Sequence, residues 1–150
     1  MRINDIINME DMKMGKLGLM IKEGFGKKED YSCSEKIVYG ANIAYDLGLD
    51  KESLKMAAGL SGGMYIEEVC GAIAGGILVL SKLFVKDKAH EGDRIKILVQ
   101  ELIKTYNDEM KHYHCKELKE MYRTPERGCG DIIFKAADIL DRIIERELGQ

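Results

Sequence analysis

The sequence contains no long apolar run and no excess of charge of either sign. In its most apolar stretch, residues 69–80, twelve consecutive residues are uncharged, which is too few to cross a bilayer but enough for a helix buried in a soluble core. The 23 basic and 26 acidic residues form no long block of one sign, so a nucleic-acid partner is not expected. Because the first residues also lack the charged and apolar regions of a signal peptide, we expect a cytoplasmic protein without a membrane span.

Short cysteine motifs are missing as well. The four cysteines, Cys33, Cys70, Cys115 and Cys129, lie far apart, and neither a C-x-x-C pair nor a C-x-x-C-H haem motif occurs. A haem is therefore not expected, and any metal site has to be assembled by the tertiary fold. In a reducing compartment these thiols stay reduced, which favours metal ligation or catalysis over a disulfide framework.

The apolar residues that are present recur with helical spacing, and no strand pattern accompanies them. Ser32 and Asp50 are typical N-cap residues, and long amphipathic patterns cover residues 95–110 and 130–148. The pattern predicts an all-α protein, a single compact domain spanning residues 1–150, with about six helices around a buried central helix at about residues 66–84. Residues 1–15 are predicted to be an N-terminal extension.

All four cysteines fall at or near predicted helix starts. Unpaired amides and the helix dipole favour negative charge there, so we expect lowered thiol pKa values and, if the helix starts converge, a pocket lined by all four sulfurs. Such a pocket would suit a metal cluster with thiolate ligands, although buried cysteines also serve as small apolar side chains. His112 and His114, which flank Cys115, are candidate nitrogen ligands.

Small residues form stripes along the predicted central helix. Gly71 and Gly75 are four residues apart, as are Ala72 and Gly76, so either another helix or a cofactor can approach the backbone closely. Because Gly71 directly follows Cys70, we expect that replacing it with valine harms the site or thiol reactivity more than it harms folding.

These residues together resemble a family of redox-active four-cysteine proteins with a C-G-A-x-x-G motif. The segment from Cys70 to Gly75 fits that motif, the segment from Gly62 to Met64 precedes it, and the resemblance covers roughly residues 16–145. A similar domain accompanies the haems of split-Soret cytochromes, where an iron–sulfur cluster is implied. The resemblance implies that the marker cysteines are Cys33, Cys70, Cys115 and Cys129. Val69 departs from the family pattern, because a threonine is expected before the central cysteine.

Three hypotheses follow from the residues and the resemblance. In the first, the four thiolates bind an iron–sulfur cluster for electron transfer or redox sensing with an unidentified redox partner, and Gly62, Gly63 and Gly71 let backbone amides approach the sulfurs. In the second, a thiol redox enzyme uses Cys70 as the attacking thiolate. In the third, a zinc-bound or metal-free module assembles with a larger redox complex. The sequence leaves open whether a reaction is catalysed.

The opening of the chain is rich in methionine. The segment from Met9 to Met20 presents more apolar surface than a small domain usually leaves in water. We therefore expect this segment to contribute to a homodimer.

Overall fold

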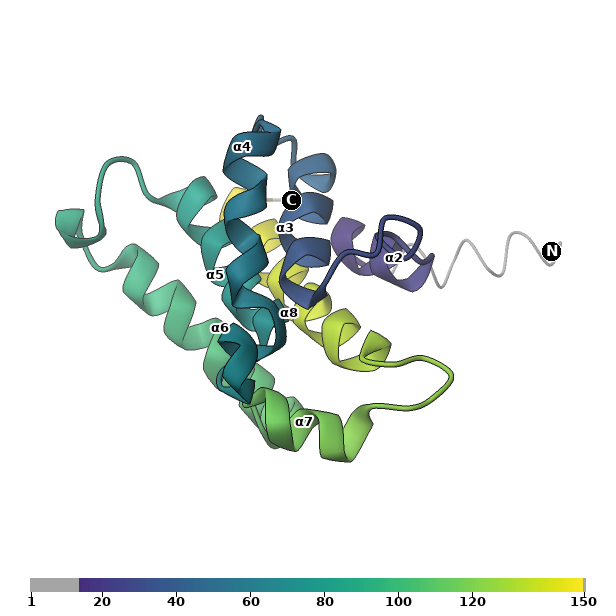
Figure 1. Cartoon of the computed structure of the whole chain (residues 1–150). Helices are drawn as coiled ribbons and strands as arrows, with labels where there is room; N and C mark the ends of the chain where they lie inside the picture. The colour runs from purple at the N-terminus through teal and green to yellow at the C-terminus, as the bar shows by residue number, and fades with distance from the viewer. Residues whose placement is uncertain (1–13, 150) are drawn as a thin grey trace, which may run out of the picture.

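The structure is a computed structural model that describes residues 14–149 (Figure 1). Almost all segments with helical periodicity in the sequence form helices in it. The described range contains no strand, which confirms an all-α fold in one compact domain. Seven α-helices occur there, against the six or so predicted. They are α2 (Lys16–Lys22), α3 (Cys33–Ala44), α4 (Lys51–Leu54), α5 (Gly71–Phe84), α6 (Arg94–Met110), α7 (Cys115–Tyr122) and α8 (Gly130–Leu148), with short turns η1 (Lys55–Leu60), η2 (Gly63–Glu67) and η3 (Ala89–Glu91).

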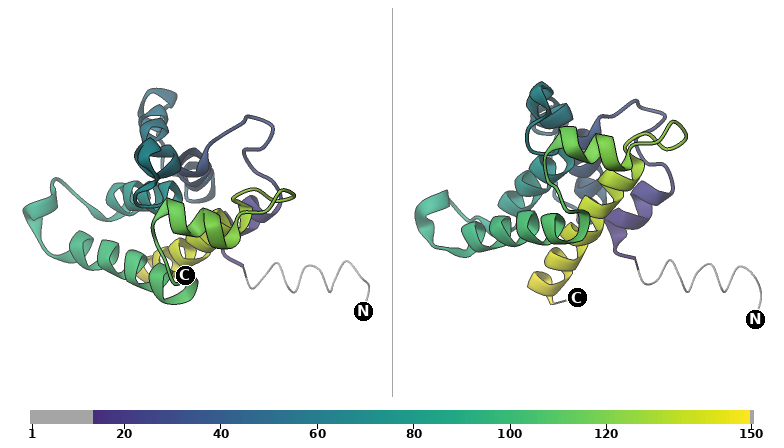
Figure 2. Two further views of the ribbon diagram at one scale, coloured as in Figure 1. Left: turned by 60° about the horizontal axis from the view of Figure 1, so that its bottom comes forward. Right: turned by 90° about the horizontal axis from the view of Figure 1, so that it is seen from below.

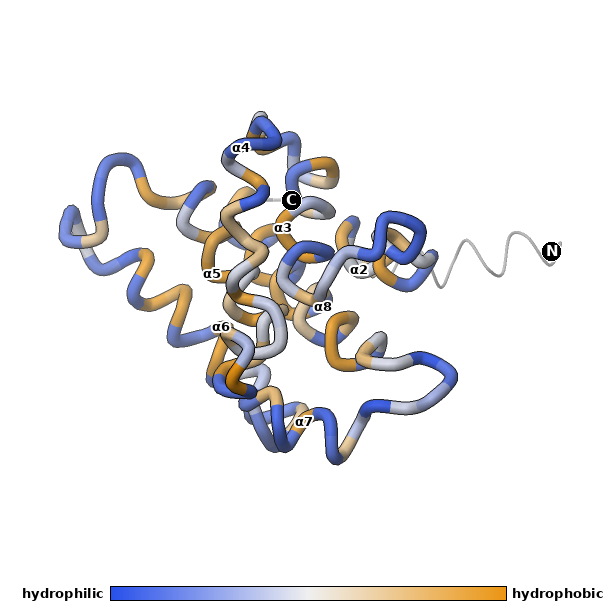
Figure 3. The backbone as a smooth tube through the Cα atoms, viewed as in Figure 1, coloured by the Kyte–Doolittle hydropathy of each residue, from blue (hydrophilic) through white to orange (hydrophobic). Residues whose placement is uncertain are grey.

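Helix α5 lies at the centre of the fold, in contact with α3, α6 and α8. Its glycines explain the close packing, because a Cβ at Gly75 would lie 2.9 Å from the carbonyl oxygen of Ser34 in α3. A Cβ at Gly76 would lie 3.1 Å from Leu102 of α6. The predicted close helix approach is thus confirmed. In Figure 3 the most hydrophobic segments gather where α5 and α8 meet, and hydrophilic ones follow the outer loops.

The central helix begins at Gly71, so the predicted start near residue 66 is wrong. Four consecutive residues, from Gly62 to Tyr65, have φ values of 56° to 64°, which makes η2 a left-handed turn. This conformation costs about 1–2 kcal/mol for each residue other than glycine. After η2, Val69 forms an isolated antiparallel bridge with His114, and an α-helix cannot continue through either feature.

Local capping follows the sequence. Ser32 caps α3 in a capping box, since its hydroxyl accepts from the Glu35 amide at 3.5 Å and its own amide donates to the Glu35 carboxylate at 2.9 Å. Asp50 caps α4 by accepting from the Ser53 amide at 2.8 Å. Both predicted caps are confirmed. The predicted buried face of α8 is confirmed too, and consists of Ile132, Ile133, Ala136, Ala137, Leu140, Ile143 and Ile144.

A buried carboxylate on α8 was not predicted. Asp141 is 1 % exposed and accepts hydrogen bonds from the backbone amides of Leu17 at 3.2 Å and Gly18 at 2.7 Å. The Tyr45 hydroxyl also donates to it. One carboxylate therefore satisfies the first turn of α2 and holds the end of α3, although both are distant from α8 in sequence.

This carboxylate should make stability depend on pH. Burial raises the pKa of Asp141 above its ordinary value of 3.8, although hydrogen bonds from Tyr45, Gly18 and Leu17 act in the opposite direction. The folded state therefore keeps this proton to a higher pH than the unfolded state does. The contribution to stability is complete below about pH 3.8 and is lost as the pH rises through the raised pKa.

We expect the natural protein to lose stability relative to Asp141→Asn, which cannot ionise, as the pH rises above about 4. Urea unfolding of both proteins at intermediate pH values measures the difference between their free energies of unfolding. If the free energy of unfolding of the natural protein, relative to that of Asp141→Asn, stays constant or increases with pH, the raised pKa of Asp141 is contradicted.

Two remaining expectations concern surfaces. No helix within residues 14–149 is long and apolar enough to span a membrane. Part of the methionine-rich opening, residues 9–13, lies outside the described residues. In the rest of that segment Leu17 is fully buried, and α2 packs against α8 within the same chain. Homodimer formation through the opening stays a prediction.

Candidate functional site

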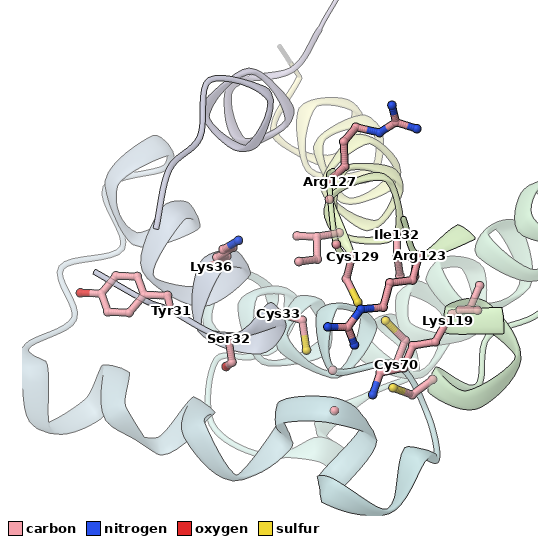
Figure 4. Close-up of a pocket in the computed structure, with 17 residues that line it drawn as sticks. Tyr31, Ser32, Cys33, Lys36, Cys70, Lys119, Arg123, Arg127, Cys129 and Ile132 are labelled. Carbon is pink, nitrogen blue, oxygen red and sulfur yellow. The ribbon is translucent and has the colours of Figure 1, made fainter. Parts of the chain in front are cut away.

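The four cysteines stand at four helix starts. Cys33 and Cys115 are the first residues of α3 and α7, and Cys70 and Cys129 directly precede α5 and α8. All four line one cavity of about 420 Å³. Figure 4 shows the sulfurs of Cys33, Cys70 and Cys129 turned toward the same space. The predicted pocket is therefore present, in that all four cysteines line one cavity.

A short antiparallel pairing brings Cys70 and Cys115 together. The residues just before these two cysteines form the isolated bridge between segments that are distant in sequence. The Cys70 amide donates to the Tyr113 carbonyl at 2.9 Å, and the Cys115 amide donates to the Glu68 carbonyl at 2.6 Å. These two hydrogen bonds set the two helix starts side by side, and both cysteines are buried at the cavity wall.

Gly71 makes room for the Cys33 sulfur. A Cβ at Gly71 would lie 2.5 Å from Cys33 Sγ and 2.6 Å from the Leu60 carbonyl oxygen, so only glycine fits there. The expectation that a side chain at this position intrudes on the site is therefore supported. Because the Leu60 backbone would also be displaced, we now expect damage to the fold as well.

The other two candidate glycines differ from each other. Gly62 lines the cavity together with Gly71, whereas Gly63 is absent from its lining. A Cβ at Gly63 would lie 2.6 Å from the Glu68 amide nitrogen, and its φ of 64° favours glycine. Gly63 therefore shapes the η2 turn, and of the three candidate glycines Gly62 and Gly71 line the cavity wall.

A loop closed by backbone hydrogen bonds places Cys129 at the cavity. Thr124 and Gly128 exchange two backbone hydrogen bonds, with N···O distances of 3.1 Å and 2.7 Å. The loop between α7 and α8 protrudes from the helical body in Figures 1 and 2. Its return places Cys129 at the start of α8, half-buried at the side of the cavity.

Burial dominates the electrostatics of Cys70. This side chain is 3 % exposed, and burial, with a smaller effect of Cys33, raises the pKa of Cys70 to about 12. The amides of Ala72 and Ile73 approach the sulfur without forming full hydrogen bonds and lower the pKa only in part. The expected lowering of this thiol pKa is wrong, because desolvation outweighs the helix dipole.

Cys115 behaves in the same way. Burial raises the pKa of Cys115, and the nearby Lys119 ammonium opposes that change only partly. Both buried sulfurs are therefore protonated near neutral pH unless a metal removes the proton. Coordination to a metal deprotonates a thiol outright, so a raised pKa is compatible with a ligand role.

The sequence did not point to the cations around the cysteines. Among residues 14–149, four basic side chains line the cavity and no acidic side chain does; the four are Lys36, Lys119, Arg123 and Arg127. Basic residues are common throughout the chain, so only their convergence in space distinguishes these four.

The two candidate histidine ligands lie outside the cavity lining. His114 Nε2 is 3.8 Å from the Glu68 carboxylate, and its ring lies 4.4 Å from the Tyr113 ring. His112 contributes nothing to the cavity wall either. The two histidines therefore add no nitrogen donor to the four cysteine sulfurs at the cavity.

Comparison with known proteins gives one match. Residues 31–143 match a family described as "Putative redox-active protein (C_GCAxxG_C_C)", and all four cysteines fall in that range. The printed pattern places glycine before the second cysteine and alanine after it, whereas this chain has Val69 before Cys70 and Gly71 after it. No curated protein and no solved structure matches the chain significantly. Because the match covers most of the 150 residues, the chain belongs to this family of four-cysteine, redox-active proteins.

Proposed function

We propose that the protein binds an iron–sulfur cluster through Cys33, Cys70, Cys115 and Cys129 and serves electron transfer or redox sensing. The observation that carries this proposal is the convergence of four free thiols, from four distant segments, on one cavity. Iron–sulfur clusters are commonly held by four cysteine thiolates. Four free thiols also suit a reducing compartment, and we propose the cytoplasm.

The spread of the donors favours a cluster over a single zinc ion. With metal–sulfur bonds of about 2.3 Å, one ion holds its four sulfurs about 4 Å from one another. Within the described residues, no three cysteine, histidine or acidic side chains are arranged to hold one ion. A cluster distributes its ligands over several iron atoms, so its sulfurs lie further apart. The cavity of about 420 Å³ between the thiols suits such a larger group.

The residues around the four cysteines have specific roles in this proposal. A bound cluster would supply one-electron chemistry, and the chain would hold and tune it. The burial of Cys70 and Cys115 excludes water from two of the ligands, and Gly62 and Gly71 bring backbone close to the sulfurs. Burial and nearby amides are among the factors that set the potential of such a cluster.

A thiol redox enzyme that uses Cys70 as its nucleophile receives less support. Attack on a disulfide requires an accessible thiolate. Cys70 is 3 % exposed and has a pKa raised to about 12, so almost none of it is ionised or accessible at neutral pH. We propose no catalysed reaction.

The proposal predicts iron and acid-labile sulfide in protein purified without oxygen. The same sample should show visible absorption, and zinc should be absent. Single serine substitutions of the four cysteines should each reduce iron and sulfide content by more than half, because each removes one ligand. Ser81→Ala is the control, since that hydroxyl lies on α5 and donates to the Ile77 carbonyl at 2.9 Å.

Other outcomes would overturn the proposal in distinct ways. Colourless protein without metal, in which oxidation consumes two thiols, would favour disulfide chemistry. Zinc without iron or sulfide would favour the zinc-bound module that assembles with a larger redox complex. Normal iron content in any of the four serine variants would remove that cysteine from the ligand set.

A further inference from the structure

The lining of the four-cysteine cavity is charged with one sign only. Lys36, Lys119, Arg123 and Arg127 line it, and no aspartate or glutamate in the described part of the chain does. The whole chain has a net charge of −3, so the cavity differs in sign from the protein that contains it. A concave site with one sign of charge concentrates ligands of the opposite sign.

Two of these cations extend into the cavity. In Figure 4 the side chains of Arg123 and Lys119 extend across the space between the sulfurs, whereas the guanidinium of Arg127 turns away. Arg127 pairs with Asp131 at 2.9 Å. Lys119 has one long contact with Glu67, at 3.7 Å. Among the described residues, no acidic group forms an ion pair with Arg123, which leaves its guanidinium available to a ligand.

The cavity is also large enough for a small molecule. Its volume of about 420 Å³ lies within the range of about 300–1,000 Å³ that is common for ligand pockets. The starts of α3 and α8 meet the cavity at Cys33 and Cys129, but each first turn carries an acidic residue, Glu35 in α3 and Asp131 in α8. The cationic side chains are therefore the feature that favours an anionic ligand.

We propose that Arg123 and Lys119 bind a small molecule that carries a carboxylate or phosphate group at the mouth of the four-cysteine cavity. The planar guanidinium of Arg123 can hold two oxygens of such a group, and the Lys119 ammonium adds a third donor. The bound anion would lie beside the sulfurs. The binding of this anion does not depend on the cluster. Its role, as a ligand that the redox centre senses or exchanges electrons with, rests on the proposed function.

The test is calorimetric titration of the anaerobically purified protein with citrate and, separately, with inorganic phosphate at constant ionic strength. We expect saturable binding of at least one of them. Arg123→Gln and Lys119→Gln should each weaken it at least about tenfold, since each removes a charge-assisted hydrogen bond. Lys116→Gln is the matched control, because Lys116 is exposed on the same helix as Lys119 and is absent from the cavity lining. That variant should change the affinity less than about twofold.

Two results would reject the proposed anion site. One is that neither anion binds saturably, and the other is that Lys116→Gln weakens binding as much as Arg123→Gln does. Repeating the titration on metal-free protein separates this inference from the cluster proposal. Binding with the same dependence on Arg123 and Lys119 in protein that never takes up iron would support the anion site and reject the cluster.

Discussion

Replacing Gly71 with valine is expected to prevent iron uptake and to destabilise the metal-free protein by about 1–3 kcal/mol. A Cβ there would lie 2.5 Å from Cys33 Sγ and 2.6 Å from the Leu60 carbonyl oxygen. Displacing the first atom moves a proposed ligand, and displacing the second disturbs the backbone of η1. Iron and sulfide content after anaerobic reconstitution and thermal unfolding of metal-free protein measure the two effects.

Gly76→Val is the matched control for this experiment. Gly76 lies further along α5, and a Cβ there would lie 3.1 Å from Leu102 Cδ2 and 3.7 Å from Leu140 Cδ1, so it would meet apolar side chains and no cysteine. We expect similar destabilisation, but normal iron uptake by the protein that folds. If both variants lose iron equally, or if Gly71→Val binds iron normally, Gly71 is a packing residue and not part of the site.

Replacing Asp141 with alanine is expected to destabilise the protein by about 3 kcal/mol or more. Three donors, the amides of Leu17 and Gly18 and the Tyr45 hydroxyl, would lose their acceptor. Each buried polar group left without a partner costs about 1–3 kcal/mol. Because domains of this kind have a total stability of about 5–15 kcal/mol, urea unfolding should resolve the loss easily.

Two milder variants calibrate this result. Tyr45→Phe removes one of the three hydrogen bonds to Asp141 and should cost about 1 kcal/mol. Asp108→Ala removes an exposed ion pair with Lys104 and should change stability by less than about 0.5 kcal/mol. A loss for Asp141→Ala no greater than that for Asp108→Ala would show that the buried carboxylate does not hold α2 and α8 together.

Much of the helical framework could be predicted from the sequence because helices are built from local contacts. The buried stripe of α8 repeats every three or four residues, and the caps at Ser32 and Asp50 act on amides three residues away. The position of each cysteine at a helix start is local in the same sense. These features were therefore correctly predicted from residue order alone.

The start of α5 marks the limit of such reasoning. The residues from Met64 to Val69 contain no proline and continue into an apolar run, so the periodic pattern extends the helix back to about residue 66. The left-handed turn η2 and the pairing that precedes Cys70 interrupt it instead. The contacts with the segment before α7 therefore outweigh the local preference of these residues for helix.

By itself the sequence determined an all-α protein with four cysteines at helix starts and no haem motif. Only the tertiary structure decided that these cysteines share one cavity, that burial raises two of their pKa values, and that Arg123 and Lys119 extend into the same cavity. The Leu17 amide and Asp141 are 124 residues apart, and their hydrogen bond likewise has no trace in any local pattern. Periodicity and capping record interactions over three or four residues, whereas burial and charge convergence arise where distant segments meet.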